Sequence, residues 1–561
     1  MGTSSLSGCV FGKLIGKRKE ERKRLMDTCS QIIAQTLKDL GVRRMFGLPG
    51  GEILDLIEAG RGMGLEFVAT RHEVVAAFMA DVTGQIMGTP GVCLSTLGPG
   101  ATNLISGVAN AYLDRSPVLA FTAQLSSAMQ PYASHQFISL EELFRPVTKK
   151  VFTLSANRTE QTIREGFRLA TRWPKGPVCF CLPSDVAKME ETRVPDLSSG
   201  VESEWQETID EKLISHTIQE ICNAKTPLII LGIGIDPAKD TDVIRDFILR
   251  TGIPVLSTPK AKGIFPESNA LYLGTASGMM ADELVVDLIM KADLVIGLGF
   301  DPVESDKIWY KDVNLLSINR YSIRYRNYSP FMEVIGDIKR NLELLMRADF
   351  SKHAWNRTDL EAFKVSMARR LAPTGKPRSG LFSPYQVVVQ ARKALSDATV
   401  ITTDVGAHKL LMGQVWKPEN PLTFLMSNGL SSMGYGFPAA MAAKLCFPRS
   451  QVVCFTGDGG FAMNLQDLET AVRLNLPVVT IVLCDGSFSL IEVIQKKRGY
   501  PRKGVNFEPI KFASVAEGFG ARGVRLGSIE ELPGVLSAGF LSSRPTVVEV
   551  PVDGSEYEEQ L

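Results

Sequence analysis

The chain has 561 residues, of which 45% are hydrophobic and 22% are charged, and its formal net charge is +1. This length is too great for one hydrophobic core, so about two to four domains are expected. The near-zero net charge excludes a broad electrostatic attraction to nucleic acids or membranes, and the composition is that of an ordinary soluble globular protein.

Residues 1–25 form a basic N-terminal extension that includes the run KLIGKRKEERKR. A solvated terminal segment is the favoured interpretation, and a targeting address or a nucleic-acid arm is the alternative. No apolar stretch has the length of a membrane span and no signal-peptide pattern is found, so the sequence predicts a cytoplasmic protein. The nine cysteines are scattered, mostly in apolar strand-like runs, which favours reduced buried thiols over disulfides.

Polar, turn-rich segments near residues 190–208 and 350–380 predict three domains, at 26–190, 209–350 and 380–553. Each block alternates short apolar runs with helical patterns. The runs are GVCLST, VLAFTA and GPVCFCLP in the first block, PLIILGIG, PVLSTP and ADLVIGLGF in the second, and ATVITTDVG, QVVCFTGDG and PVVTIVLCDG in the third. They predict buried parallel strands with crossover helices, and so three doubly wound α/β domains whose ligands bind beyond the carboxyl ends of the strands.

In the third block, QVVCFT is a predicted strand, GDGG the loop after it, and Asn464 a predicted cap of the helix LQDLETAVRL. Because PVVTIVLC is the next strand, Asp458 and Asp485 would lie at the carboxyl ends of neighbouring parallel strands. Two carboxylates and a loop carbonyl make an incomplete oxygen shell that suits Mg²⁺ bound with a phosphate. Glycines at 457, 459 and 486 would let the backbone approach that phosphate. The alternative is a tight turn followed by a helix cap.

These motifs resemble those of the pyruvate oxidase and acetolactate synthase superfamily of thiamine diphosphate enzymes. GDGG with Asp485 is similar to its metal motif, whose third ligand is a backbone carbonyl, here that of Ser487. Most members carry Asn at the position of Asp485, and Asp there is similar to the FAD-independent, catabolic acetolactate synthases. The resemblance also rests on MFGLPGG, TRHEVVAAFMADVTG, STLGPGATN, SHQFISLEELFRPVTK, TDVGAHKL and MSNGLSSMGYGFPAA. It implies pyrimidine-binding, central and diphosphate-binding domains.

The resemblance implies two catalytic positions. Glu73 matches the family's glutamate, which exchanges a proton with the aminopyrimidine of the cofactor; an apolar pocket would raise its pKa toward the working pH. A helix-start glutamate favoured by the helix dipole is the alternative. Gln136 matches a glutamine that lines the pyruvate pocket.

The resemblance also implies the cofactor-binding positions. Met433 matches the large apolar side chain that bends the thiamine, although a methionine is more often core packing. Val405, Gly406 and His408 match the loop beside the diphosphate, and a surface position is the alternative for His408. The remaining predicted cofactor-binding residues are Gly50, Gly429, Gly457, Gly459 and Gly460.

The implied cofactors are thiamine diphosphate and Mg²⁺. The implied reaction decarboxylates pyruvate and transfers the hydroxyethyl carbanion to a second 2-oxo acid, giving 2-acetolactate and CO₂. The alternatives are a 2-oxo acid decarboxylase, an oxalyl-CoA decarboxylase-like lyase, a sulfoacetaldehyde acetyltransferase-like enzyme, or a binding subunit without catalysis. Ile494 and Val303 stand where biosynthetic relatives carry acceptor-recognising Trp and Arg, so the acceptor is open.

FAD is possible but not favoured, because GIGID in the second block lacks the full G-x-G-x-x-G pattern. This block is predicted to be a degenerate nucleotide-type domain with a structural role. In relatives one subunit binds the aminopyrimidine and another the diphosphate. The resemblance therefore implies a homodimer or homotetramer with active sites at the subunit interface.

Overall fold

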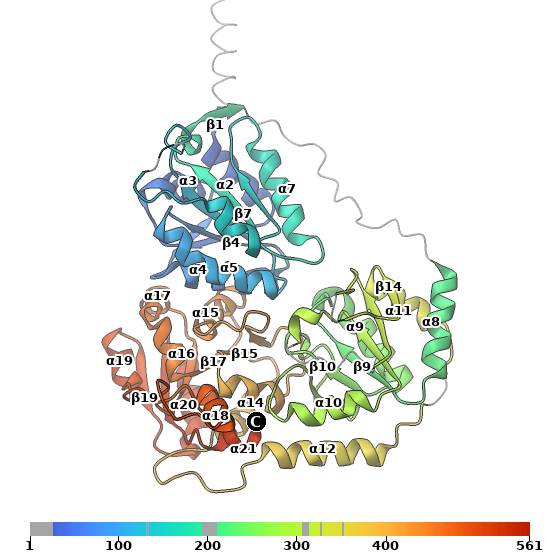
Figure 1. Ribbon diagram of the computed structural model, residues 1–561. Coiled ribbons are helices and arrows are strands. Elements are labelled where there is room, and N and C mark those ends of the chain that lie inside the picture. The colour runs from blue at the N-terminus through green and yellow to red at the C-terminus, as the bar shows by residue number, and fades with distance from the viewer. Residues whose placement is uncertain are drawn as a thin grey trace, which may run out of the picture.

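The computed structural model describes residues 26–130, 132, 134–192, 210–305, 313–325, 328–350 and 353–561 (Figure 1). These residues form three six-stranded sheets and one two-stranded sheet. The strands pair in parallel throughout the three large sheets, which confirms the predicted three doubly wound α/β domains. The predicted N-terminal extension and residues 193–208 of the first predicted linker lie outside the described residues.

The sheet of the first domain has the strand order β3-β2-β4-β5-β7-β6. Its strands are β2 (Arg44–Gly47), β3 (Glu66–Ala69), β4 (Gly91–Ser95), β5 (Val118–Gln124), β6 (Lys150–Thr153) and β7 (Val178–Pro183). Its helices are α2 (Cys29–Asp39), α3 (Leu54–Gly62), α4 (Glu73–Met87), α5 (Pro99–Leu113), α6 (Leu140–Phe144) and α7 (Thr159–Thr171). The short strands β1 (Met26–Thr28) and β8 (Glu190–Thr192) pair antiparallel beside them.

The third domain repeats this topology, with the order β16-β15-β17-β18-β20-β19. Its strands are β15 (Val400–Thr403), β16 (Phe424–Met426), β17 (Val452–Gly457), β18 (Val479–Cys484), β19 (Arg522–Arg525) and β20 (Thr546–Pro551). Its helices are α13 (Pro384–Ala394), α14 (Ala407–Val415), α15 (Gly436–Cys446), α16 (Asp458–Met463), α17 (Leu468–Arg473), α18 (Ser489–Lys497), α19 (Phe512–Gly518), α20 (Leu532–Leu541) and α21 (Glu556–Gln560). In both domains the direction of winding reverses beside the first strand, where such folds bind ligands.

The central domain has a different order, β11-β10-β9-β12-β13-β14. Its strands are β9 (Pro227–Leu231), β10 (Val255–Ser257), β11 (Tyr272–Thr275), β12 (Leu294–Leu298), β13 (Leu315–Asn319) and β14 (Met332–Ile335). Its helices are α8 (Glu211–Asn223), α9 (Pro237–Thr251), α10 (Asp282–Met290) and α11 (Ile338–Leu345). This is the strand order of dinucleotide-binding folds, in which the ligand lies between the first and fourth strands, here β9 and β12.

Helix α12 (Arg357–Leu371) occupies much of the second predicted linker, near 350–380. Asn356 caps this helix by accepting a hydrogen bond from the backbone N–H of Thr358 (2.8 Å). Only Leu360, Met367 and Leu371 of α12 are buried. Because a helix with so few buried positions is mostly polar, its sequence has the composition of a linker.

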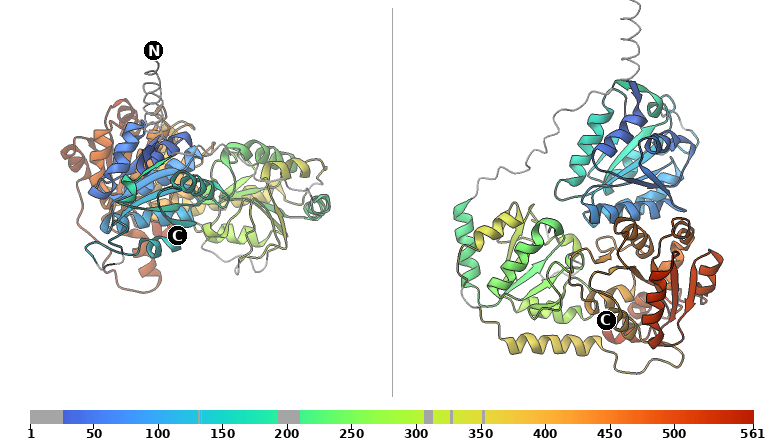
Figure 2. Two further views of the ribbon diagram at one scale, coloured as in Figure 1. Left: turned by 90° about the horizontal axis from the view of Figure 1, so that it is seen from above. Right: turned by 180° about the vertical axis from the view of Figure 1, so that it is seen from behind.

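The three domains meet around shared buried surfaces. Helix α4 is buried along most of its length because it packs between the first sheet and α15 of the third domain, in one hydrophobic cluster (Figures 1 and 2). Lys260 of the central domain donates to Gln85 Oε1 (2.8 Å) and Asp114 Oδ2 (3.1 Å) of the first domain and to the Met426 carbonyl (3.0 Å) of the third. No helix within the described ranges has both the length and the apolar character that crossing a membrane requires.

Candidate active site

Asp458 and Asp485 lie at the carboxyl ends of adjacent strands. β17 pairs with β18 in parallel, with Gly457 opposite Leu483. Oδ2 of Asp458 accepts hydrogen bonds from the backbone N–H groups of Asp485 (3.1 Å) and Gly486 (2.8 Å). The first carboxylate therefore holds the loop that carries the second. The segment GDGG is not the expected loop, because α16 begins at Asp458 directly after the strand.

The carboxyl group of Asp458 is buried, and that of Asp485 close to it is half-buried. Burial, and then the charge of Asp458, raise the pKa of Asp485 to about 7. Burial also raises the pKa of Asp458, although backbone hydrogen bonds favour its ionised form. A cation between them would oppose these shifts. Over the described ranges no three His, Cys, Asp or Glu side chains form a metal cluster, so a cation here would also need carbonyl, phosphate or water oxygens.

Ser487 belongs to the loop between β18 and α18. Its N–H donates to Asp485 Oδ1 (3.1 Å) and its hydroxyl donates to Glu492 Oε2 (2.6 Å). The hydroxyl of Ser489 donates to the other oxygen of Asp485. These bonds fix the loop beside the carboxylate pair. The role of the Ser487 carbonyl as a metal ligand stays a prediction.

Except for Gly429, the predicted cofactor residues of the third block line one cleft, together with Asp458, Asp485 and Ser487. The cleft encloses ≈ 720 Å³, part of which is open to solvent. The predicted residues in its walls are Val405, Gly406, His408, Met433, Gly457, Gly459 and Gly460. Sequence reasoning missed its apolar side, which Phe488, Leu490, Ile491 and Tyr557 form. No motif separates these four residues from ordinary core positions.

His408 is buried rather than at the surface, so the surface alternative is wrong. Burial lowers the pKa of its imidazole to about 4, and the ring is therefore neutral near pH 7. Among the described residues its Nε2 has no hydrogen-bond partner. A buried, unpartnered nitrogen in the wall of this cleft is available to a ligand.

Asp404 organises the cleft, and the sequence did not single it out. Its fully buried carboxylate accepts hydrogen bonds from the N–H groups of Val405 (2.7 Å) and Gly434 (2.9 Å). A Cβ added to Gly460 would lie 2.9 Å from its Oδ2, so only glycine fits there. Asp404 thereby joins the loop of Val405 to the loop of Met433. Asp404 lies within the motif TDVGAHKL, but its bonds to Gly434 join residues that are far apart in the sequence, so the motif alone does not predict them.

Asn464 does not cap the following helix, contrary to expectation. Its side chain donates instead to the carbonyl of Gly434 (2.7 Å), where the backbone turns with φ of 83°. A local capping signal was therefore overridden by a tertiary hydrogen bond that positions the loop after Met433.

Glu73 is the first residue of α4, as the sequence predicts. It is only 4% exposed, and its Oε2 accepts a hydrogen bond from Asn103 Nδ2 (3.0 Å). A Cβ added to Gly100 would lie 3.2 Å from Oε1. A buried carboxyl group held against the first turns of α5 is more than a solvated helix-start glutamate. Its catalytic role stays a prediction.

Gln136 and Gly50 border the loop between β4 and α5 in the first domain. Gln136 has φ of 61°, and a Cβ added to Gly98 would lie 3.0 Å from the Gln136 Cβ. A Cβ added to Gly50 would lie 2.5 Å from the Cβ of Thr96. Glu73, Gln136 and Gly50 are thus gathered at the carboxyl edge of the first sheet.

Gly429 lies at a domain contact and is absent from the described lining of the cleft. Its N–H donates to Asp114 Oδ1 (2.7 Å), and an added Cβ would lie 2.7 Å from the carbonyl oxygen of Leu113. Packing against the first domain therefore accounts for this glycine. Its contact with a cofactor stays a prediction.

Three family models match the chain. Residues 27–143 match the N-terminal TPP binding domain of thiamine pyrophosphate enzymes, residues 214–345 the central domain, and residues 404–550 the C-terminal TPP binding domain. The chain belongs to the thiamine pyrophosphate enzyme family. The resemblance seen in its motifs is confirmed, and all residues lining the cleft with Asp458 except Tyr557 lie within the match to the C-terminal TPP binding domain.

This thiamine pyrophosphate enzyme is similar to proteins named as acetolactate synthases. It is 30% identical to an acetolactate synthase of Bacillus subtilis, covering 96% of this chain and 95% of that protein. It is 31% identical to a probable acetolactate synthase large subunit of Methanocaldococcus jannaschii, covering 94% and 92%. It is also 29% identical to a putative thiamine pyrophosphate-containing protein of Bacillus subtilis, covering 94% and 92%.

The side chains of the cleft fit thiamine diphosphate bound with Mg²⁺. The neighbouring carboxylates of buried Asp458 and half-buried Asp485 would supply hard oxygen ligands for a cation that keeps few protein ligands. The unpartnered Nε2 of His408 lies in the same wall. A diphosphate oxygen bound there would give this buried nitrogen a hydrogen-bond partner.

Proposed function

We propose that this thiamine pyrophosphate enzyme is an acetolactate synthase-like carboligase. It would decarboxylate pyruvate and transfer the two-carbon unit to a second 2-oxo acid, giving 2-acetolactate and CO₂. The observation that carries the proposal is the pair Asp458 and Asp485 at adjacent strand ends, in one cleft with His408 and Met433. The relatives named acetolactate synthase, which match nearly the whole chain, support the reaction class.

In this proposal Asp458, Asp485 and the Ser487 carbonyl hold Mg²⁺. When bound, thiamine diphosphate supplies a thiazolium carbon that can add to a 2-oxo acid and accept the electrons released with CO₂. His408 contacts the diphosphate. The buried imidazole of His408 is neutral near pH 7. An adjacent diphosphate anion would raise the pKa of the imidazole and favour a donating N–H at Nε2.

Glu73 would hold and transfer the proton that activates the cofactor. Asn103 fixes the Oε2 edge of its carboxyl group, and burial of the residue keeps competing water away. Gln136, at the same edge of the first sheet, would contact the substrate. Met433 would support the thiamine, since it lines the same cleft as Val405 and Gly406.

The two predicted halves of this site lie on different domains, with Glu73 on the first and Asp458 on the third. Glu73 is not among the described residues that line the cleft of Asp458. We therefore propose that the carboxyl edge of the first domain faces the cleft of a second copy. A homodimer is the minimum assembly, and a homotetramer built from two such dimers is compatible with it.

Two positions, Ile494 and Val303, bear on the choice of the acceptor 2-oxo acid. Ile494 lies on α18, whose first turn contributes Ile491 to the cleft, and Val303 lies in the short helix η5 (Pro302–Glu304). Neither can act like the Trp or Arg of the biosynthetic pattern. The putative thiamine pyrophosphate-containing relative keeps a second outcome open, namely another thiamine diphosphate lyase or transferase.

Product analysis tests the proposal. Purified protein is mixed with thiamine diphosphate, Mg²⁺ and pyruvate, and the products are identified by NMR. The proposal predicts 2-acetolactate and CO₂ in equal amounts. Acetaldehyde as the main product would indicate a decarboxylase, an acyl-transfer product a transferase, and no turnover with cofactor bound a non-catalytic subunit. The cytoplasmic location stays a prediction, which imaging of the tagged protein would test.

A further inference from the structure

The central domain has the strand order of a dinucleotide-binding fold, but the place for the ligand is filled. In such folds the phosphate binds between β9 and β12, against the loop after the first strand. Here the N–H of Gly234 donates to the carbonyl of Gly299 (2.7 Å). A Cβ added to Gly232 would lie 2.5 Å from the Cα of Phe300. The two loops therefore touch through their backbones.

At this edge of the central sheet, a buried carboxylate accepts hydrogen bonds from the neighbouring donors. Glu304 is 4% exposed, and its Oε2 accepts from the N–H of Ile233 (2.8 Å) and the hydroxyl of Thr258 (2.8 Å). Its Oε1 accepts from the N–H of Lys260 (3.1 Å). The donors belong to the loops after β9 and β10. Backbone N–H groups and a hydroxyl converging on one anion are the donor set of a phosphate site.

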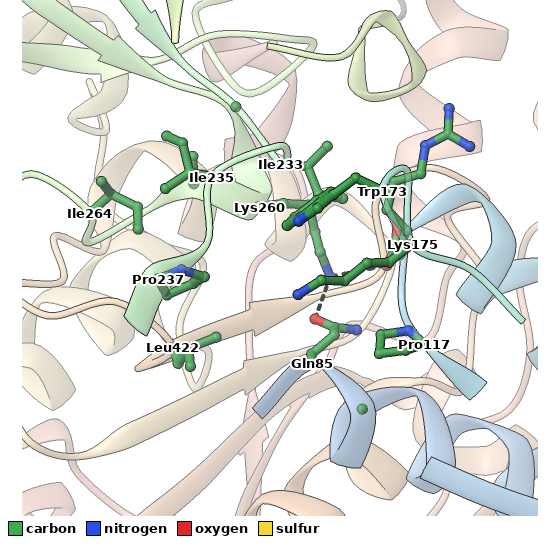
Figure 3. A pocket seen from close by; sticks show the side chains of 15 residues that line it. Gln85, Pro117, Trp173, Lys175, Ile233, Ile235, Pro237, Lys260, Ile264 and Leu422 are labelled. Atoms are coloured by element: carbon green, nitrogen blue, oxygen red, sulfur yellow. Dashed lines mark hydrogen bonds and ion pairs between the residues drawn. The ribbon is translucent and has the colours of Figure 1, made fainter. Parts of the chain in front are cut away.

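The neighbouring pocket is lined by aromatic and charged groups of the chain, among them Trp173, Lys175 and Lys260 (Figure 3). It encloses ≈ 530 Å³, part of it open to solvent. Lys175 Nζ lies 4.4 Å from the ring centroid of Trp173, and the guanidinium of Arg320 lies 5.5 Å from it. The aromatic face that could stack on a nucleotide base is therefore shared with two internal cations. FAD does not fit this arrangement.

We infer that Glu304 is a built-in anion of the central domain: its carboxylate occupies the donors with which this fold would hold a dinucleotide phosphate, and the enzyme works without FAD. The same residue also couples the domains, because its carbonyl accepts a hydrogen bond from Asn428 Nδ2 (3.2 Å). Asn428 belongs to the loop that leads to Met433. An internal anion of this kind keeps the domain junction closed with no bound ligand.

The test compares wild type with Glu304→Ala, Glu304→Gln and the control Glu343→Ala, an exposed glutamate on α11 of the same domain. Each protein is incubated with FAD and desalted, and retained flavin is read by visible absorbance. The thermal midpoint is then measured alone and with inorganic phosphate or acetate. Burial raises the pKa of Glu304 to about 7, so the measurements are made above that pH.

Wild type and Glu343→Ala should retain no flavin, and neither anion should change their midpoints. Glu304→Ala removes the common partner of three donors at a buried carboxylate, so its midpoint should fall by about 5 °C or more. Acetate or phosphate should restore part of this loss, because an anion that binds the vacated donors stabilises the folded state. Glu304→Gln fills the same space, so it should lose less and show no rescue.

Stoichiometric retention of FAD by wild type would overturn the inference. So would equal anion effects on wild type and Glu304→Ala, or a midpoint of Glu304→Ala equal to that of wild type. If Glu304→Ala does not fold, Glu304→Gln decides: a midpoint equal to that of wild type would show that the charge is not needed. None of these measurements uses pyruvate turnover, so their outcome is independent of the proposed carboligase reaction.

Discussion

Removing the carboxylate of Asp404 should loosen the cleft from within. In Asp404→Ala the N–H groups of Val405 and Gly434 lose their partner. The hydroxyl of Thr456 also donates to Asp404 Oδ2 (3.3 Å), but it can still donate to the Gly457 carbonyl (3.0 Å). Two hydrogen bonds to a charged group contribute about 1.5–3 kcal/mol each, so the expected loss is about 3–6 kcal/mol. Both freed loops carry predicted cofactor contacts, Val405 and Met433.

The assay combines thermal denaturation of the apoprotein with titration of thiamine diphosphate in excess Mg²⁺. If binding must supply about 1.4 kcal/mol to reorder the loops, affinity falls about tenfold. The matched control is Asp467→Ala, since Asp467 is equally buried and accepts hydrogen bonds from the N–H of Arg71 (2.8 Å) and the hydroxyl of Thr470 (2.9 Å). It should lose stability but keep cofactor affinity. Equal affinity losses in both variants, or none in Asp404→Ala, would refute the reasoning.

Three further substitutions test individual residues. Glu73→Gln should lower turnover by about 10²–10⁴-fold, the range for loss of a general acid–base group, while calorimetry shows thiamine diphosphate binding unchanged; full activity would remove its catalytic role. Asp458→Ala should lose Mg²⁺ and thiamine diphosphate together in equilibrium dialysis, and retained cofactor affinity would count against the metal assignment. His408 has its pKa lowered by burial from 6.5 to about 4, so the stability that comes from its neutral form is present above pH 6.5 and lost as the pH falls toward 4. His408→Gln cannot titrate, and its melting midpoint should therefore decline less than that of wild type over this range; parallel curves would contradict the assignment.

Short-range patterns were enough to predict the strand ends. The apolar runs before Asp458 and Asp485 fixed two buried strands, and their order along the chain fixed their adjacency. Glu73 was predicted at the start of α4 because an apolar helix follows it directly. The short apolar runs in each domain likewise predicted parallel sheets.

Long-range polar contacts could not be predicted. The bonds of Asp404 to Gly434, of Asn464 to Gly434 and of Glu304 to Ile233 join residues that only the folded sheets bring together. Nothing local distinguishes such a buried acceptor from a helix cap or a turn residue. Helix α12 was missed for another reason, namely that it buries only one narrow stripe.

The shared active site is tested most directly by mixing two inactive subunits. Glu73→Gln and Asp458→Ala chains are co-expressed with different tags, and the heterodimer is purified by two affinity steps. If Glu73 of one copy acts on a cofactor anchored by Asp458 of another, each heterodimer regains one intact site, and its turnover should reach about half that of wild type while both homodimers stay inactive. A heterodimer as inactive as its parents would contradict the account.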